Sequence, residues 1–443
     1  MRSENDFITR NIDLNALIDT HAVLEIIQRL NRHGYETYLV GGAVRDLLIN
    51  RTPKDYDVST AATPEEVREV FSRRRARIIG RRFKIVHIRD GEHIIEVSTF
   101  RRIPSKKEIE DQAREQELER ELQEQNHDDQ QADDNPDHGH HHHHHAYHSK
   151  DEKASMLIRN DNEYGTSYED AWRRDFTVNA IFYDPIKKRI IDYTCKGLSD
   201  LERKIVRVIG DPATRFSEDP VRMLRALKLV GQYGFTLEDQ TQSALVRMQS
   251  DIKLASLSRL TLELEKILKK TYAWKILNVF YEYGFLSSFM PNLHSSFQSK
   301  EAKLAMELLK SRCEFMLENK IPDSLINAMS AMALPFIALK FSGNPEDAVH
   351  LYEHDEKKPM RRVLREVFHP MNFPRWMICE AVDAIFLQNK LFSRERFTKS
   401  RRHRSFFSAL DLALVVNQCI VKDENFEAFW DKTLYKIFPK KRH

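Results

Sequence analysis

Residues 38–46 read Tyr38-Leu39-Val40-Gly41-Gly42-Ala43-Val44-Arg45-Asp46, and residues 55–58 read Asp55-Tyr56-Asp57-Val58. The apolar residues before the two glycines predict a β-strand that turns into a short helix over residues 43–49. A second strand is expected over the Asp-x-Asp segment. Because strand side chains alternate between faces, the two aspartates are expected on one face and Tyr56 and Val58 on the other. Together the two segments predict an α/β unit early in the chain.

The paired carboxylates indicate a site for divalent cations. Strand geometry holds Asp55 and Asp57 roughly 7 Å apart at their roots, where they repel each other unless a cation lies between them. Two metal ions about 4 Å apart can clamp the attacking and leaving oxygens of a phosphoryl transfer. The missing Cβ atoms of Gly41 and Gly42 let backbone N–H groups approach phosphate oxygens. Each motif alone also occurs on ordinary polar turns, but their combination favours a catalytic site for a nucleotide.

Two further residues are candidates for the same site. Arg45 lies three residues into the predicted helix, where a triphosphate would meet a helix N-terminus and a guanidinium together; the alternative is a surface ion pair with Asp46. A strand over residues 93–99 places Glu96 on one face with Ile94 and Ser98, so Glu96 is a candidate third acidic group. The alternative for Glu96 is the ordinary polar face of an antiparallel strand.

Length and composition predict several domains and a chain that does not enter a membrane. The 443 residues predict two to four domains, and 41% of them are apolar. No apolar run approaches the length of a membrane span, and the first residues lack the apolar core of a secretory signal. Four cysteines without Cys-x-x-Cys spacing are typical of reduced thiols, which predicts a cytoplasmic protein. The net charge of +3 is small, so only local basic clusters would attract nucleic acid.

The pattern along the chain predicts an α/β head followed by helices. Residues 13–33 have helical periodicity closed by Gly34, and residues 63–66 form a capping box that starts another helix. Strands are expected over 83–88 and 93–99, joined by a turn at residues 90–91. Breaks in the helical part are expected near residues 284, 291, 322, 335, 343 and 370–374.

The domain boundaries follow from these changes of pattern. We expect a catalytic head over 1–102 and 156–193, a helical neck over 194–256, and a helical body with a C-terminal RNA-binding region over 257–443. The intervening residues 103–155 are acidic, include the run His140–His145, and have almost no large apolar residues. This composition predicts a disordered insertion, and the histidine run is not expected to be catalytic.

Two later motifs carry concentrated charge. In the first, Arg173 and Arg174 could bind phosphates while Asp175 accepts from ribose hydroxyls, although a structural ion pair explains the motif almost as well. In the second, Asp219 and Arg222 are three residues apart and are expected on one helix face, where they could meet the hydrogen-bonding edge of a base. The alternative is that Asp219 caps the helix and pairs with Arg222.

These motifs, taken in order, resemble a known family, the class II nucleotidyltransferases, which comprise bacterial poly(A) polymerases and tRNA CCA-adding enzymes. The resemblance covers roughly residues 35–235 and rests on segments 39–46, 55–57, 173–180 and 218–226. It implies that Asp55 and Asp57 hold two Mg²⁺ ions, with Mn²⁺ as a substitute, and that the architecture is a head, neck, body and helical C-terminal part. The nucleotide-binding residues that it implies are Gly41, Gly42, Arg45, Arg173, Arg174, Asp175, Asn179, Asp219, Arg222 and Arg225.

Within the family, segment 79–88 is similar to the one that marks poly(A) polymerases, as are segments 156–166 and 368–407. The long acidic insertion and the short tail after Phe438 depart from the family pattern. The short tail puts strong nonspecific affinity for RNA in doubt, because each lost phosphate contact weakens binding. The basic residues expected to contact RNA are Arg81, Arg82, Lys84, Arg401 and Arg402.

The sequence therefore predicts a template-independent RNA nucleotidyltransferase, closest to a poly(A) polymerase. The 3′-hydroxyl of RNA would attack the α-phosphate of ATP, and Arg45 would neutralise charge on the leaving pyrophosphate. The expected partners are ATP and RNA 3′ ends, with no membrane, and the expected state is a monomer. One alternative is CCA or A addition to tRNA. The other is a noncatalytic RNA-binding protein on the same scaffold.

Overall fold

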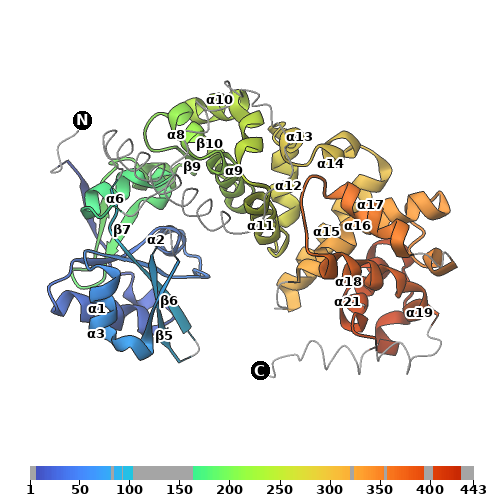
Figure 1. Ribbon diagram of the computed structural model, residues 1–443, viewed down its shortest axis with the longest axis horizontal. Helices are drawn as coiled ribbons and strands as arrows, with labels where there is room; N and C mark the ends of the chain where they lie inside the picture. Colours follow the sequence, from blue (N-terminus) through green and yellow to red (C-terminus); the bar gives the residue numbers. More distant parts are fainter. Residues whose placement is uncertain are drawn as a thin grey trace, which may run out of the picture. The chain divides into compact units, whose positions relative to one another are not determined.

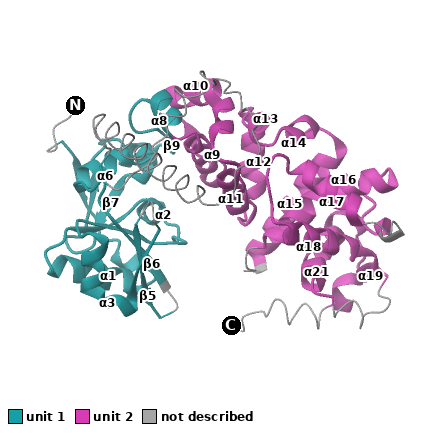
Figure 2. Ribbon diagram, viewed as in Figure 1, with its two compact units in different colours: residues 1–218 teal, residues 219–443 magenta. Residues whose placement is uncertain are grey.

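The computed structural model describes residues 6–80, 84–91, 93–102, 163–319, 324–353, 357–393 and 403–430. The chain divides into two compact units, Met1–Glu218 and Asp219–His443 (Figure 2). The predicted insertion 103–155 lies outside the described residues, as do Arg81, Arg82, Arg401 and Arg402. The division at residue 218 does not test the finer boundaries predicted for head, neck and body.

The first unit is built on a mixed sheet of eight strands among the described residues (Figure 1). Their order across the sheet is β1-β8-β7-β2-β3-β6-β5-β4. All neighbouring pairs are antiparallel except β3 and β6, which are parallel. The strands are β1 (Ile8–Asn11), β2 (Thr37–Val40), β3 (Asp57–Thr60), β4 (Ala76–Ile79), β5 (Ile85–Asp90), β6 (His93–Thr99), β7 (Ile181–Asp184) and β8 (Arg189–Asp192).

Helices cover this sheet, which confirms the predicted α/β head. The helix α1 (His21–Arg32) packs against β2, β3 and β6, and α3 (Pro64–Arg75) packs against β4 and β5. The helix α6 (Ser167–Arg173) adds Ala171 to an apolar cluster with Tyr38, Val40 and Phe182 of the sheet. The remaining elements of the unit are η1 (Asn15–Leu17), α2 (Gly42–Leu48), η2 (Thr177–Asn179), α7 (Gly197–Glu202), β9 (Ile205–Val206) and α8 (Pro212–Glu218).

Several local predictions in this unit are confirmed. Thr63 and Glu66 form the capping box that starts α3, because each side chain bonds to the backbone N–H of the other residue. Gly34 follows α1 with φ +88°, a conformation that glycine adopts without strain. The turn at Gly91 joins β5 and β6 as an antiparallel hairpin. Tyr56 and Val58 are buried whereas Asp55 and Asp57 are exposed, as the alternation predicted.

Other predicted elements differ in their bounds. The helix expected over 13–33 is interrupted, because Thr20 is extended (φ −130°, ψ 123°) and only residues from His21 onward form α1. The strand of the Asp-x-Asp motif begins at Asp57, so Asp55 lies just before it. The strand expected over 83–88 is β5, shifted to Ile85–Asp90. Strands β1 and β4 were not predicted, because their short segments carry exposed polar residues within charged sequence.

The second unit is almost entirely helical, as predicted. Two short elements interrupt its helices near the start, β10 (Thr236–Leu237) and η3 (Gln249–Leu254). The helices are α9 (Val221–Tyr233), α10 (Asp239–Met248), α11 (Leu257–Leu268), α12 (Ala273–Glu282), α13 (Leu286–Phe289), α14 (Pro291–Ser296), α15 (Lys300–Asn319), α16 (Leu325–Ser342), η4 (His350–Glu353), α17 (Lys357–Val367), α18 (Arg375–Phe386), α19 (Gln388–Phe392), α21 (Phe406–Val416) and the π-helix η5 (Asn417–Val421).

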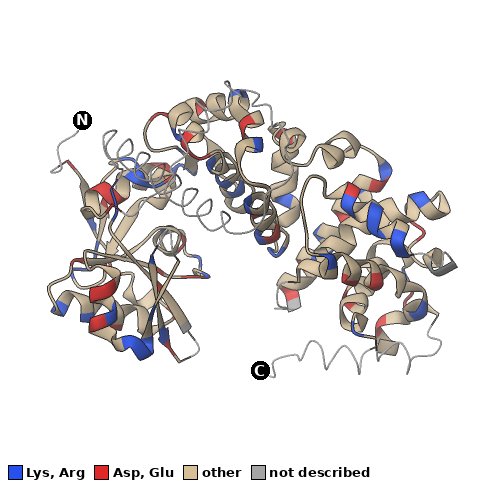
Figure 3. Ribbon diagram, in the orientation of Figure 1, with Lys and Arg blue, Asp and Glu red and all other residues tan. Residues whose placement is uncertain are grey.

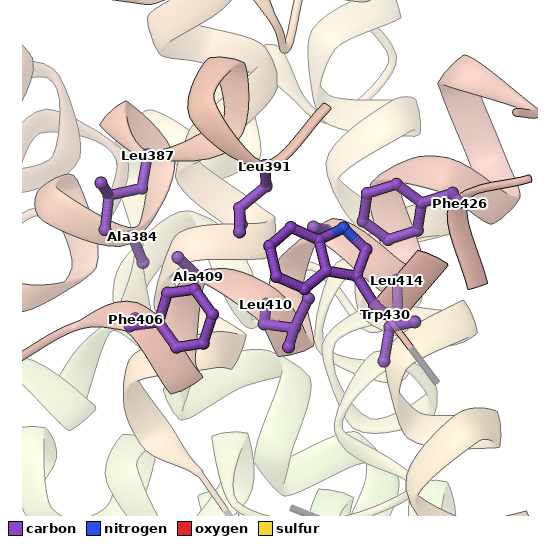
Figure 4. Close-up of a cluster of buried hydrophobic side chains, with 10 residues drawn as sticks. Ala384, Leu387, Leu391, Phe406, Ala409, Leu410, Leu414, Phe426 and Trp430 are labelled. Carbon is purple, nitrogen blue, oxygen red and sulfur yellow. The ribbon is translucent and has the colours of Figure 1, made fainter. Parts of the chain in front are cut away.

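The C-terminal helices enclose a separate apolar cluster. Figure 4 shows the indole of Trp430 and the ring of Phe406 among leucines contributed by α19 and α21. Phe426 lies in the same cluster, and its ring centroid is 6.4 Å from that of Trp430. Burial of several large apolar side chains gives this end of the second unit its own core.

The helix α16 departs from two expectations. Pro335 was predicted to mark a break, but α16 continues through it. Among the described residues, α16 is also the one helix long and apolar enough to cross a membrane, although no such run was expected. In this structure 67% of that stretch is buried, and α16 packs against α15, α17, α18 and α21. This packing is typical of a core helix, and burial on several sides explains why the helix tolerates the proline.

Candidate active site

Asp55 and Asp57 lie at the start of β3 with their side chains exposed. Among the described residues, neither carboxylate accepts a hydrogen bond or forms an ion pair within 4.0 Å. Asp57 pairs with Val40 of β2 on one side and with Glu96 of β6 on the other. Because directly opposite residues share a face, the Asp57 side chain lies on the same face of the sheet as Val40 and α6. The two carboxylates are therefore fixed by a central strand and open to a ligand.

The environment of Asp57 disfavours its negative charge. Removal of the carboxylate from bulk water raises its pKa, and the charges of Glu96 and Asp55 raise it further, against the opposing effect of the Arg174 guanidinium. Solvent still reaches part of this side chain, but the surrounding protein restricts its hydration. A carboxylate beside other carboxylates, only partly compensated by the Arg174 guanidinium, is stabilised by binding a metal ion.

Glu96 occupies the place predicted for the third acidic group. The parallel register puts it directly beside Asp57, and its carboxylate Oε1 lies 3.3 Å from Nε2 of His87 on β5. His87 in turn pairs with Arg77 of β4. One row across the sheet therefore runs from Asp57 through Glu96 and His87 to Arg77, all on the same face.

Gly41 brings the backbone of the Gly-Gly turn close to the Asp-x-Asp strand. Its φ of +73° and ψ of −137° are accessible to glycine and strained for other residues. A Cβ at this position would lie 3.2 Å from Nη1 of Arg174 and 3.8 Å from Oδ2 of Asp57. The Gly-Gly turn, the Asp-x-Asp strand and Arg174 therefore meet at one place, although more than 100 residues separate Asp57 from Arg174.

Asp170 organises the two arginines of the predicted phosphate-binding motif. Its Oδ1 accepts from Nε of Arg173 at 3.0 Å, and its Oδ2 accepts from Nη2 of Arg174 at 2.9 Å. Although burial alone would raise the pKa of Asp170, the charges of Arg174 and Arg173 hold it below its ordinary value. Arg174 also donates to Ser59 Oγ at 3.2 Å, and its guanidinium lies over the Phe182 ring.

The structural ion pair considered for this motif is therefore real, but it is formed with Asp170. Sequence reasoning missed Asp170. The available signal was its position three and four residues before the two arginines in a helix, where side chains share a face.

A second buried residue, Arg215, was also missed. Its Nη2 donates to the backbone carbonyls of Arg173 at 2.6 Å and of Arg174 at 3.1 Å, and its Nη1 donates to Glu218 at 2.7 Å. These carbonyls lie at the end of α6, where backbone acceptors lack partners within the helix. Arg215 thus fixes the segment that carries the two arginines. No sequence signal singled out Arg215 from other arginines near the following helix.

Arg45 is held by protein groups. It is 7% exposed, and its Nε and Nη2 donate to Oδ1 of Asp46 at 3.0 and 2.8 Å. Its Nη1 donates to the side-chain oxygen of Asn179 at 2.5 Å. The ion pair with Asp46 therefore forms in the interior instead of at the surface. Asn179, a predicted nucleotide-binding residue, connects α2 to η2 through this contact, and the phosphate role of Arg45 stays a prediction.

The structure leaves the predicted ligand contacts of Asp175 and Lys84 untested. Asp175 is partly buried in the segment after α6, and its backbone carbonyl accepts from Ile209 at 3.2 Å. Its predicted contact with ribose stays a prediction. The ammonium of Lys84 lies 3.1 Å from Glu65 on the surface, a pair of small energetic value, and its predicted contact with RNA stays a prediction.

The residues expected to read the base belong to the second unit. Asp219 precedes α9, so it does not share a helix face with Arg222 as predicted. Its Oδ1 accepts from the backbone N–H of Val221 at 3.2 Å, while Pro220 is the N-cap residue of α9. Its Oδ2 accepts from Arg259 at 2.8 Å and lies 4.0 Å from Arg225. Arg222 is buried. Asp219 therefore bonds to the first backbone N–H of α9 without occupying the N-cap position, which is Pro220, and its carboxylate pairs with Arg259, which the sequence did not indicate.

The donor set of the first unit suits a metal ion that keeps other ligands. Within the residues that the structure describes, no group of three or more His, Cys, Asp or Glu side chains is arranged to enclose a metal ion. Mg²⁺ is commonly bound by one or two carboxylates plus substrate phosphates and water. Asp55 and Asp57, both lacking protein donors in the described part of the chain, fit that mode of binding.

Two family models match the chain. One, described as "Poly A polymerase head domain", matches residues 37–207, and the other, "Probable RNA and SrmB- binding site of polymerase A", matches residues 234–297. Poly(A) polymerase I of Escherichia coli is 31% identical over 398 residues, which is 88% of this chain and 76% of that protein. Poly(A) polymerase I of Haemophilus influenzae is 35% identical over 286 residues. The matched region is 65% of this chain and 55% of the length of that protein.

Other similar proteins are CCA-adding enzymes. A CCA-adding enzyme of a Geobacillus species is 33% identical over 70% of this chain and 66% of its own length. The crystal structure of the Bacillus stearothermophilus CCA-adding enzyme with CTP has a TM-score of 0.58 and 24% identity, covering 94% of this chain and 81% of that one. A tRNA nucleotidyltransferase in complex with a primer tRNA and an ATP analogue has a TM-score of 0.55 at 22% identity. These structural likenesses show a shared fold.

Proposed function

Because the chain belongs to the family of nucleotidyltransferases that contains poly(A) polymerases and CCA-adding enzymes, we propose that it adds AMP from ATP to RNA 3′ ends without a template. The 3′-hydroxyl loses its proton to solvent as its oxygen forms a bond to the α-phosphorus, the bond from that phosphorus to the α–β bridging oxygen breaks, and pyrophosphate leaves. The single observation that carries the proposal is the open pair Asp55 and Asp57, exposed beside Gly41 and lacking protein donors within the described residues.

The residues of the first unit have distinct roles in this proposal. Asp55 and Asp57 hold Mg²⁺, or Mn²⁺ in its place, and Glu96 adds negative charge beside them. When bound there, Mg²⁺ supplies Lewis-acid charge to the attacking hydroxyl and to the phosphate oxygens. Gly41 keeps the backbone close to the nucleotide, and Arg174, fixed by Asp170, contributes positive charge near the phosphates. Positioning and electrostatics provide most of the catalysis in such transfers.

In the second unit, Asp219 is proposed to take part in base selection together with Arg222 and Arg225. A carboxylate has about four lone-pair sites, so the bonds from Val221 and Arg259 leave Asp219 with further acceptor capacity. The proposal therefore does not require Asp219 to release Arg259.

Adenylate addition is favoured over CCA addition by the extent of the likeness. The Escherichia coli poly(A) polymerase matches 88% of this chain, whereas the Geobacillus CCA-adding enzyme matches 70%. CCA or A addition to tRNA is the second candidate, because its enzymes share 33% identity with the chain and the same fold. We further propose that the protein acts in the cytoplasm as a monomer.

The test supplies the full chain with either an unstructured RNA or a tRNA that lacks its CCA end, each with ATP or CTP and with Mg²⁺. The proposal predicts repeated AMP incorporation on both RNAs and little CMP incorporation. Ordered addition of C, C and A to the tRNA alone would replace the proposal with its second candidate. Absence of any incorporation with Mg²⁺ or Mn²⁺ would favour a noncatalytic RNA-binding protein.

A further inference from the structure

The helix α17 (Lys357–Val367) separates basic and apolar residues onto two faces. Its buried side consists of Met360, Val363, Leu364 and Val367, which lie at the three- and four-residue spacing of one helical face. The opposite side carries Lys358, Arg361, Arg362 and Arg365, which we call the basic face of α17. At 1.5 Å per residue, the basic face extends about 10 Å along the helix axis.

The basic face is largely open to solvent and forms no close ion pair with the described residues. Lys358, Arg362 and Arg365 are exposed and Arg361 is half-buried. No carboxylate among the described residues lies within 4.0 Å of any of the four side chains. The neighbouring Lys357 differs, because its ammonium lies 2.8 Å from Asp383. Figure 3 shows how Lys and Arg recur along this helix. Four adjacent cations without partners repel one another, and a polyanion would relieve that repulsion.

The packing of α17 makes the basic face rigid. The helix contacts α16 and α18 through its apolar side, and its end is bonded to α14, where Nδ2 of Asn292 donates to the backbone carbonyl of Glu366 at 2.8 Å. A rigid row of cations loses less conformational entropy on binding than cations on a flexible tail.

An exposed aromatic residue lies at the start of α18, the helix that packs against α17. Trp376, in the first turn of α18, is 57% exposed, and Arg375 beside it is exposed as well. A large aromatic ring left in water next to cations is the arrangement with which proteins stack nucleic-acid bases while holding the backbone. This second observation favours a nucleic acid over an acidic protein as the partner.

We propose that the basic face of α17, with Trp376, binds the backbone and a base of single-stranded RNA. The surface lies outside residues 234–297, the segment matched by the RNA-binding family model. It lies within the C-terminal part, 257–443, in which the sequence predicted an RNA-binding region, but it involves none of the individual residues singled out for RNA contact. The inference goes beyond the proposed chemistry, since it requires only that the protein bind RNA.

The experiment measures binding of a fluorescent 20-nucleotide single-stranded RNA to the full chain without ATP and in the presence of a chelator, across a series of salt concentrations. The test variant is R362A/R365A. The matched control is K303A/K340A, which removes two exposed lysines of α15 and α16 and changes the net charge equally. Circular dichroism of each variant checks that the helices are retained.

Each lost phosphate contact lowers the slope of log affinity against log salt by about 0.7 for a single strand. The proposal predicts that R362A/R365A lowers this slope by about 1.4 and weakens low-salt affinity roughly tenfold or more, with little effect in the control. W376A is expected to weaken binding without changing the slope, because stacking involves no counterion release.

Unchanged affinity and slope in R362A/R365A, or equal losses in both pairs, would overturn the proposal. The proposal would also be overturned if R362A/R365A lost affinity for polyglutamate but kept its affinity for RNA, because that result would identify an acidic protein as the partner. As binding is measured without ATP or metal, a protein that binds RNA through α17 and incorporates no nucleotide would contradict the proposed function alone.

Discussion

Nη2 of Arg174 donates to Oδ2 of Asp170 at 2.9 Å, and this bond holds the guanidinium near the strand that carries Asp57. Asp170 is 1% exposed, so its charge depends on its two arginines. The same guanidinium lies 3.2 Å from where a Cβ of Gly41 would be. A buried carboxylate outside the recognisable motifs therefore sets the position of a residue inside them.

Removing this carboxylate is expected to impair stability and nucleotide binding together. Asp170→Ala removes the carboxylate that pairs with Arg173 and Arg174. Breaking a buried pair costs about 3–5 kcal/mol, and because the two arginines are partly exposed the expected loss is about 2–4 kcal/mol. Urea unfolding of the variant measures the loss. Arg10→Ala is the control, since its ion pair with Glu202 is exposed and should contribute almost nothing. Equal midpoints for Asp170→Ala and the original protein would contradict this role.

Gly41→Ala is expected to abolish most nucleotide incorporation. The backbone conformation there is strained for alanine by about 1–3 kcal/mol, and the new Cβ would press on Arg174 at 3.2 Å. Gly34→Ala is the matched control, because Gly34 also has a positive φ but nothing lies within 4 Å of its Cβ position. Similar stability losses with activity lost only in Gly41→Ala would support the account. Full activity in Gly41→Ala would contradict it.

Gly231→Ala should destabilise the second unit although alanine is the better helix former. A Cβ on α9 would lie 2.7 Å from Cα and 3.0 Å from the backbone nitrogen of Ile276 on α12. We expect a loss of about 1–3 kcal/mol from overpacking, measured by urea unfolding. Ile276→Ala in the same background should not restore stability, because the clash involves the backbone. Stabilisation by Gly231→Ala would show that α9 and α12 are less tightly packed than described.

The buried carboxyl of Asp411 should make stability depend on pH. Burial raises its pKa to about 6, against the opposing charge of Arg312, and Nδ2 of Asn327 donates to its Oδ2. Because the folded state holds this proton up to a higher pH than the unfolded state, stability falls as pH rises from about 4 to 6. Asp411→Asn should therefore be stabilising at pH 7.5, by up to about 3 kcal/mol, and nearly neutral at pH 4. If Asp411→Asn were less stable than the original protein at pH 7.5 and not at pH 4, the result would contradict this prediction.

The sequence predicted those parts of the head that local chemistry determines. The Gly-Gly turn, the alternation around Asp57, the capping box of Thr63 and the hairpin at Gly91 each follow from a few neighbouring residues. The alternation of its strand made Glu96 a candidate third acidic group, whereas its place directly beside Asp57 depends on the parallel pairing of β3 and β6. The bounds of the early helix were wrong because periodicity continues through Leu14 and Ile18, which are buried, while the backbone between them and α1 is extended.

The rest of the site depends on contacts between distant segments. Asp170 and Arg215 act on Arg174 through tertiary structure, and Arg259 reaches Asp219 from 40 residues away. No local spacing rule links such pairs, because only the tertiary fold brings the partners together. Pro335 was read as a break because propensity favours it, but the buried surroundings of α16 override that preference.

The central claim is that Asp55 and Asp57 together hold the metal ions of a nucleotidyl transfer. The most direct measurement compares AMP incorporation into RNA by the original protein, Asp55→Ala and Asp57→Ala, with circular dichroism and urea unfolding to confirm that each variant is folded. Both aspartates are exposed, so stability should change by less than about 1 kcal/mol. The account predicts folded variants without measurable incorporation. A folded Asp55→Ala or Asp57→Ala protein that still extends RNA would contradict it.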